Sequence, residues 1–147
     1  MNKYPMTTIK HWWPVVLWMS LIFLFSTELF SGTNTTSFLR TILSSLLPDI
    51  SADQIETVHL ILRKLGHWGE YLILALLSIR ALHADLPAQT RQRRAASAIA
   101  IATLYAASDE WHQSFVPSRS ASIVDVLIDC LGATCGAFWF EWRRRGR

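Results

Sequence analysis

The sequence predicts an all-α fold: an integral membrane bundle of four transmembrane helices, with an extra amphipathic helical segment outside the membrane. Three observations predict it: four apolar stretches, tryptophans at their ends, and basic residues at alternate connections. Hydrophobic residues make up 51% of the chain, little more than in a soluble protein, so their placement carries the prediction. A soluble bundle with long core helices is the alternative. At 147 residues, we expect one domain covering residues 1–147.

The first predicted span covers residues 12–30 and reads "WWPVVLWMSLIFLFSTELF". It contains no charged side chain from Trp12 to Thr27. Of the four stretches, it is the one expected to meet the requirement of roughly twenty apolar residues for crossing a bilayer. A cleaved signal peptide is the alternative, but no small-residue cleavage site follows the apolar core. We therefore predict a retained helix.

The other three predicted spans cover residues 66–83, 95–112 and 121–142. The last of them is interrupted by Asp125 and Asp129. Tryptophan prefers the boundary between lipid and water, and six of the seven tryptophans lie at predicted span ends. These are Trp12, Trp13, Trp68, Trp111, Trp139 and Trp142. Their distribution favours spans over soluble core helices.

The basic residues predict how the four spans are oriented. Many of them fall on one side of the membrane if the helices cross in turn: Lys3, Lys10, Arg91, Arg93, Arg94, Arg143, Arg144, Arg145 and Arg147. The opposite side carries basic and acidic residues in similar numbers. Because cytoplasmic connections are enriched in Lys and Arg, both termini are predicted to be cytoplasmic.

The external segment, residues 31–65, is predicted to be helical as well. Apolar residues between 38 and 47 recur on one helical face, which indicates an amphipathic helix. This helix could lie in the outer membrane interface or cap the bundle. The motif "SADQ" at 51–54 is a capping box that starts the next helix. That helix can continue unbroken into the span at 66–83.

With this topology, polar side chains converge at the outer end of the bundle. The candidate catalytic residues are His67, Tyr71, Asp109, Glu110 and Asp125, and the candidate substrate-binding residues are Lys64, Gln113, Arg119, Ser122 and Ser26. A charge at the centre of a bilayer costs about 2.5–3.5 kcal/mol, so their presence needs a reason. A functional polar pocket is one reason. A structural ion-pair network that ties the helices together is the other.

The fourth span carries a polar and a small-residue stripe on one face. Asp129 lies one turn deeper than Asp125, and its role stays open. Further along the same face, Gly132 and Gly136 form a pair of small residues four apart. Such a pair allows a neighbouring helix to approach closely.

Several spaced motifs together resemble the VanZ-like membrane protein family. They are "K..H...Y" at 64–71, "DE..Q.F.P.R" at 109–119, "S..D" at 122–125 and "G...G" at 132–136. The namesake of the family is associated with low-level resistance to the glycopeptide teicoplanin. The resemblance implies a multi-pass protein of the bacterial cytoplasmic (inner) membrane that acts at the cell envelope. The chain departs from the pattern at Ser118, where glycine is expected, and at Asp129, where asparagine is expected.

One hypothesis is binding without catalysis. Arg119 and Lys64 would hold an anionic envelope lipid or lipid-linked precursor through charge-assisted contacts. The protein could equally change how a lipophilic glycopeptide reaches that precursor. Membrane lipids are the expected partners, and no nucleic acid is expected because no folded basic face with base-reading groups is visible.

A second hypothesis is an intramembrane hydrolase or transferase. His67 would be the general acid or base, Tyr71 its hydrogen-bond partner, and Asp109 or Asp125 the orienting carboxylate. Arg119 would clamp the anion. Ser26, Ser108 and Ser122 are candidate nucleophiles.

A third hypothesis is metal binding. The pairs His67/Glu70 and Asp109/His112 have a spacing that could present two ligands on one helical face. Basic side chains nearby would oppose a cation, so the sequence predicts no metal and no other cofactor.

Overall fold

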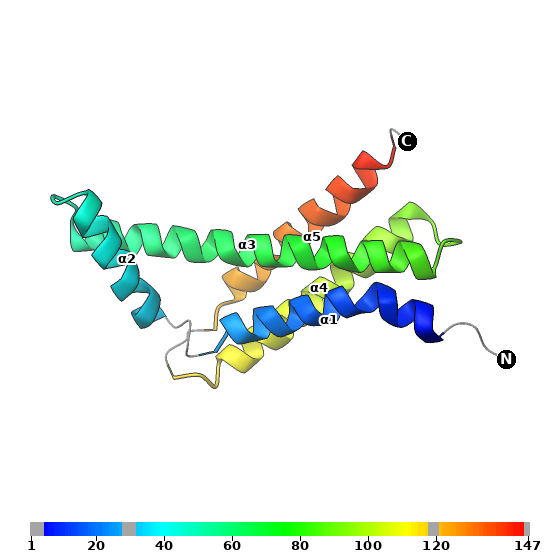
Figure 1. Ribbon diagram of the computed structural model, residues 1–147, viewed down its shortest axis with the longest axis horizontal. Helices are drawn as coiled ribbons and strands as arrows, with labels where there is room; N and C mark the ends of the chain where they lie inside the picture. Colours follow the sequence, from blue (N-terminus) through cyan, green and yellow to red (C-terminus); the bar gives the residue numbers. More distant parts are fainter. Residues whose placement is uncertain (1–4, 28–31, 118–120, 146–147) are drawn as a thin grey trace.

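The computed structural model describes residues 5–27, 32–117 and 121–145, and within these ranges the chain forms helices and no strands. This confirms the predicted all-α class. Figure 1 shows an elongated arrangement in which α3 runs along the molecule and the other helices pack around it. The helices are α1 (Pro5–Phe25), α2 (Gly32–Leu46), α3 (Ala52–Asp85), α4 (Arg91–Gln113) and α5 (Ile123–Arg143).

The central helix α3 joins the predicted external segment to the second predicted span without a break. Its 34 residues give a length of about 50 Å, longer than the hydrocarbon core of a bilayer. The predicted capping box starts it. The Ser51 hydroxyl accepts from the Gln54 backbone N–H at 3.2 Å, and the Gln54 side chain accepts from the Ser51 N–H at 2.9 Å. α2 packs on the first part of α3 (Figure 1), as a helix outside the main bundle.

Helices α3 and α5 approach each other closely at two glycines. A Cβ atom added to Gly132 would meet the backbone carbonyl of Trp68, and one added to Gly136 would meet that of Leu72. Only a residue without a Cβ fits at these two crossing points. The predicted role of the glycine pair is confirmed.

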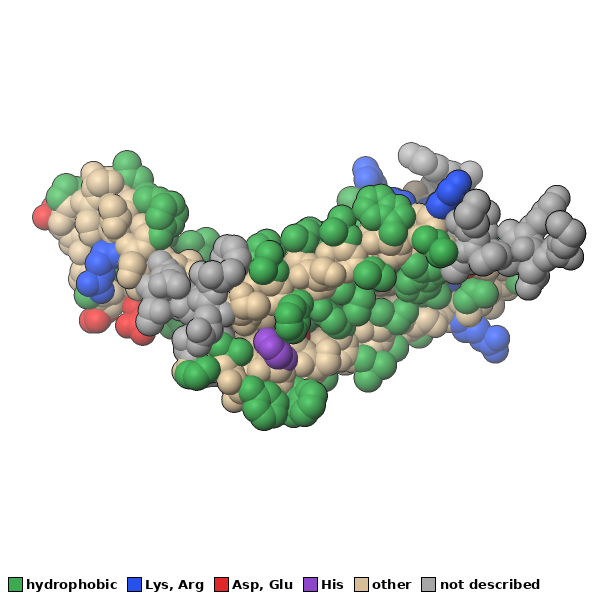
Figure 2. Space-filling model, turned by 60° about the horizontal axis from the view of Figure 1, so that its bottom comes forward, with side chains coloured by type: hydrophobic (Ala, Val, Ile, Leu, Met, Phe, Trp, Pro, Cys, Tyr) green, Lys and Arg blue, Asp and Glu red, His purple; other side chains and the backbone are tan. Residues whose placement is uncertain are grey.

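The interior contains many small residues, and much of the surface consists of large apolar ones. Alanines at the helix contacts, such as Ala75, Ala102 and Ala133, are fully buried. Large apolar side chains lie on the outside, among them Val16, Leu17, Leu104, Leu127, Leu131 and Phe138. Figure 2 shows hydrophobic side chains spread over the helices on one face of the molecule. Small residues at helix contacts and exposed apolar patches are typical of helices that pack within lipid.

By length and composition, one described helix is suited to cross a membrane. It is α5, with a mean hydropathy of 1.7. The apolar stretch of α1, Ile9–Phe25, is shorter. The prediction that only the first span would meet the length requirement is wrong, because α5 meets it. α1 ends at Phe25, and the predicted boundary of the first span at residue 30 lies outside the described ranges.

The start of α1, the connection between α3 and α4, and the end of α5 lie at the same end of the molecule (Figure 1). His11 and Trp12 both contact Asp85 there, with Nδ1 of His11 2.6 Å from Oδ1 and Nε1 of Trp12 donating to Oδ2 at 2.8 Å. The hydrogen bond with His11 lowers the pKa of Asp85 below its ordinary value. These contacts fix the beginning of α1 against the end of α3.

Candidate functional site

Polar side chains are buried together where α1, α3, α4 and α5 meet, away from the two chain ends. The end of α1 supplies a hydroxyl, α3 an imidazole, and α4 and α5 supply carboxylates. The buried polar residues of this cluster are Ser26, His67, Asp109, Glu110, Gln113, Asp125 and Asp129. Apart from Asp129, all of them are candidates predicted from the sequence. Arg119, the predicted anion ligand, lies outside the described residues.

Asp125 is held by two basic side chains of α3. Its carboxylate is 1% exposed, and Oδ2 lies 3.3 Å from Nη2 of Arg63. Oδ1 pairs with the Lys64 ammonium. The predicted binding residue Lys64 is therefore an ion-pair partner of the predicted catalytic residue Asp125. Arg63 was not among the residues predicted for the site. Its position next to Lys64 is a signal, because long side chains at adjacent positions can reach one neighbour on another helix.

Asp109 is satisfied by neutral donors. The Ser26 hydroxyl donates to Oδ1 at 2.5 Å, and Nε2 of Gln113 donates to Oδ2 at 2.9 Å. Gln113 follows Asp109 by one helical turn, as the sequence spacing indicates. Ser26 comes from the end of α1. These bonds tie α1 to α4 and leave Asp109 fully hydrogen-bonded.

Only one of the two carboxylate oxygens of Glu110 accepts a hydrogen bond from a described residue. Its Oε2 accepts from the backbone N–H of Ser122 at 2.8 Å, at the start of α5. Among the described residues, its buried Oε1 has no hydrogen-bond partner. Ser122 therefore reaches the cluster through its backbone, and its side chain does not cap α5.

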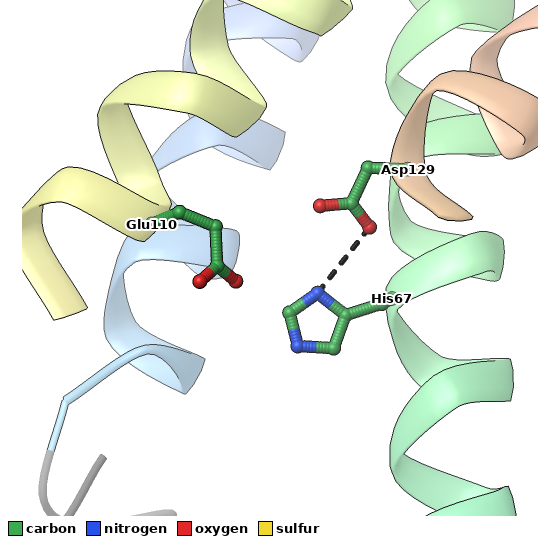
Figure 3. A group of neighbouring side chains, drawn as sticks. All are labelled: His67, Glu110 and Asp129. Atoms are coloured by element: carbon green, nitrogen blue, oxygen red, sulfur yellow. Dashed lines mark ion pairs between the residues drawn. The ribbon is translucent and has the colours of Figure 1, made fainter. Parts of the chain in front are cut away.

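His67 lies beside Asp129, as Figure 3 shows, with Nδ1 3.3 Å from Oδ1 of the carboxylate. The predicted hydrogen bond between His67 and Tyr71 is wrong. The buried Tyr71 hydroxyl has no hydrogen-bond partner within the described part of the chain. Its ring packs in the apolar core, with its centroid 6.4 Å from that of Tyr105. Asp129 takes the predicted place of Tyr71 because α5 crosses α3 at the level of His67.

A cavity of about 460 Å³ opens beside this cluster, between α2 and α3. This volume lies in the range of sites for small ligands. The apolar part of its lining includes Phe25, Phe38, Leu39 and Leu62, and the polar part includes Ser26, His59, Arg63, His67, Glu70 and Gln113. The cavity therefore connects the apolar face of α2 with the buried polar cluster. His59, which lies two turns before His67 on α3, lines the cavity but was not predicted from the sequence.

The fold and the site together define a class: a small helical protein with one helix suited to cross a membrane and a buried polar site beside a cavity. The profile of the VanZ/LLP1 family matches residues 11–144 of the chain. The chain therefore belongs to the VanZ-like family, as its motifs predict. No curated protein and no solved structure matches the chain significantly.

Proposed function

We propose that this VanZ-like protein crosses the bacterial cytoplasmic membrane four times, with both termini in the cytoplasm. The apolar outer surface and the alignment of α1, α3, α4 and α5 support four crossings. The clusters of Arg at the start of α4 and the end of α5 support this orientation, because clusters of basic residues remain on the cytoplasmic side of the membrane. The polar cluster and its cavity then face the outer side.

In this orientation, the protein binds an amphiphilic component of the cell envelope that has an anionic head group. The observation that supports this function is that the lining of the cavity has an apolar part and a polar part. Phe38, Leu39 and Leu62 offer an apolar wall for a hydrocarbon chain, and Arg63 and His67 lie where the wall becomes polar. A charge-assisted contact from Arg63 to a phosphate suits such a head group.

Binding of this kind connects the site to the cell-envelope role expected of the family. A lipid-linked precursor held in the cavity is sequestered from a large lipophilic glycopeptide. The same cavity could instead bind the lipid part of the antibiotic. Both variants of the function use the apolar wall of α2, so both depend on the space beside Leu39 and Phe38.

Filling the cavity is expected to weaken lipid binding. In Leu39→Trp, the larger ring occupies the space of a hydrocarbon chain, and we expect at least about tenfold weaker binding of a polyprenyl phosphate, or about 1.4 kcal/mol. Native mass spectrometry of the full chain in nanodiscs measures this. Leu46→Trp is the matched control, because Leu46 is on the same helix, is 71% exposed and does not line the cavity. Equal binding by both variants would place the lipid elsewhere.

A second candidate function is hydrolysis or group transfer on the bound lipid. The specific observation that favours it is the pairing of His67 with Asp129, an imidazole beside a carboxylate that orients it. The Ser26 hydroxyl lines the same cavity and is hydrogen-bonded to Asp109. His67 would accept a proton from an attacking water or hydroxyl, and Asp129 would orient its ring.

Turnover tests this second function. If purified protein hydrolyses a lipid-linked phosphate, His67→Ala is expected to slow the reaction by about 10²–10⁴-fold, because it removes the acid–base group. His83→Ala is the control, since His83 is on the same helix but outside both the cavity and the buried cluster. Product analysis by chromatography measures the rate. Full activity in His67→Ala excludes the acid–base role.

A further inference from the structure

We infer that His67, Glu110 and Asp129 form a binding site for a divalent transition-metal ion. The three residues come from three different helices, α3, α4 and α5, and all are buried. Each offers one ligand atom, and these atoms lie within 4.8 Å of one another. Figure 3 shows the imidazole and the two carboxylates directed toward a common space. A nitrogen and two oxygens are a donor set that suits Zn²⁺ or Mn²⁺.

The ligand atoms of this triad lack hydrogen-bond partners among the described residues. Asp129 is 1% exposed, yet neither of its carboxylate oxygens accepts a hydrogen bond there. Oε1 of Glu110 and Nδ1 of His67 also make no hydrogen bond there, and Nδ1 of His67 lies 3.3 Å from Oδ1 of Asp129 as an ion pair. Buried polar atoms are almost always hydrogen-bonded or bound to a metal, because leaving them unpaired is costly. A cation between the three side chains would satisfy these atoms at once.

The charges around the triad also favour a cation. Asp109, Glu110, Asp125 and Asp129 are all buried in this part of the bundle. Among the described basic residues, Arg63 and Lys64 both pair with Asp125, and the donors to Asp109 are neutral. Lys64, which was expected from the sequence to oppose a metal, is instead directed to Asp125. The two carboxylates of the triad match the charge of a divalent ion.

Metal binding requires the three side chains to move closer together. In a tetrahedral site with Zn²⁺ bonds of about 2.0–2.2 Å, two ligand atoms lie about 3.4 Å apart, so side-chain rotations must bring atoms that are up to 4.8 Å apart closer by about 1.4 Å. Three protein ligands with a position left for water are typical of catalytic zinc sites. His67 also lines the cavity, so an ion bound to it would lie next to that space. The inference does not depend on the proposed lipid binding.

Metal binding by the full chain tests the inference. The protein is purified in detergent, stripped with a chelator, and dialysed against Zn²⁺ or Mn²⁺. We expect about one ion per chain, and at least about tenfold weaker binding in His67→Ala and in Asp129→Asn, because each loses a ligand. His83→Ala and Glu56→Gln are the controls. Both residues are on α3 but outside the cavity and the triad, so both variants should bind as the wild type does.

A second measurement separates loss of the site from loss of the fold. Asp129→Asn keeps the side-chain shape and removes a buried charge, so without metal its melting temperature should equal or exceed that of the wild type. Added Zn²⁺ should raise the melting temperature of the wild type and not that of Asp129→Asn. The inference is overturned if stripped wild type binds neither ion, or if both triad variants bind as tightly as the wild type. No lipid is present, so the result is independent of the proposed function.

Discussion

Replacing Gly132 or Gly136 by alanine is expected to destabilise the protein by about 1–3 kcal/mol, the usual cost of overpacking. The reason is that each glycine faces a backbone carbonyl of α3, at Trp68 and at Leu72, which cannot rotate away as a side chain can. The two helices must move apart to admit a methyl group. Thermal unfolding of the purified protein in detergent measures the loss.

Gly69→Ala is the matched control for this prediction. Gly69 is also inside a helix, but a Cβ at this position would meet nothing within 4 Å. Alanine there is expected to be neutral or to stabilise the helix by up to about 1 kcal/mol, since glycine is the more flexible residue. If Gly132→Ala is as stable as Gly69→Ala, the close packing of α5 on α3 is not what holds them together. The same separation would move Asp129 away from His67, because Gly132 follows Asp129 and Trp68 follows His67.

The sequence predicted the helices well because helical periodicity and capping are local properties. The amphipathic pattern at 38–47 falls within α2 except for its last residue, and the capping box at Ser51 starts α3 where expected. The spacing of Gly132 and Gly136 predicted a close helix contact, since it depends on one helix face only. The end of α1 was less predictable, because the polar residues that follow Phe25 are followed in turn by Leu29 and Phe30, which extend the apolar pattern.

Which residues belong to the site could be predicted from the sequence more easily than which of them contact each other. Helical spacing indicates which residues share a face, but a contact between helices depends on how each is rotated and where they cross. His67 and Tyr71 share a face of α3, yet His67 pairs with Asp129 of α5 and Tyr71 packs in the core. The predicted metal-ligand pairs failed to identify the triad for the same reason, since each lies within one helix and the triad takes one residue from each of three.

Removing the positive partners of Asp125 is expected to destabilise the protein by about 3 kcal/mol. In Arg63→Met with Lys64→Met, the carboxylate of Asp125, which is 1% exposed, keeps its burial and loses both ion pairs. An uncompensated buried charge costs about 3–5 kcal/mol, and the lower value applies because the Lys64 side chain is 36% exposed. Chemical unfolding in detergent measures the change. Arg40→Met with Arg93→Met is the control, because both residues are exposed and lie away from Asp125.

Adding Asp125→Leu to the Arg63→Met, Lys64→Met variant separates a structural network from a functional site. The third change removes the uncompensated charge, so we expect stability to return to near the wild-type value. Lipid binding is expected to stay weak, because Arg63 lines the cavity and its charge is lost. If stability and polyprenyl phosphate binding both return, the ion pairs between α3 and α5 serve the fold alone, and the head group is held by other residues.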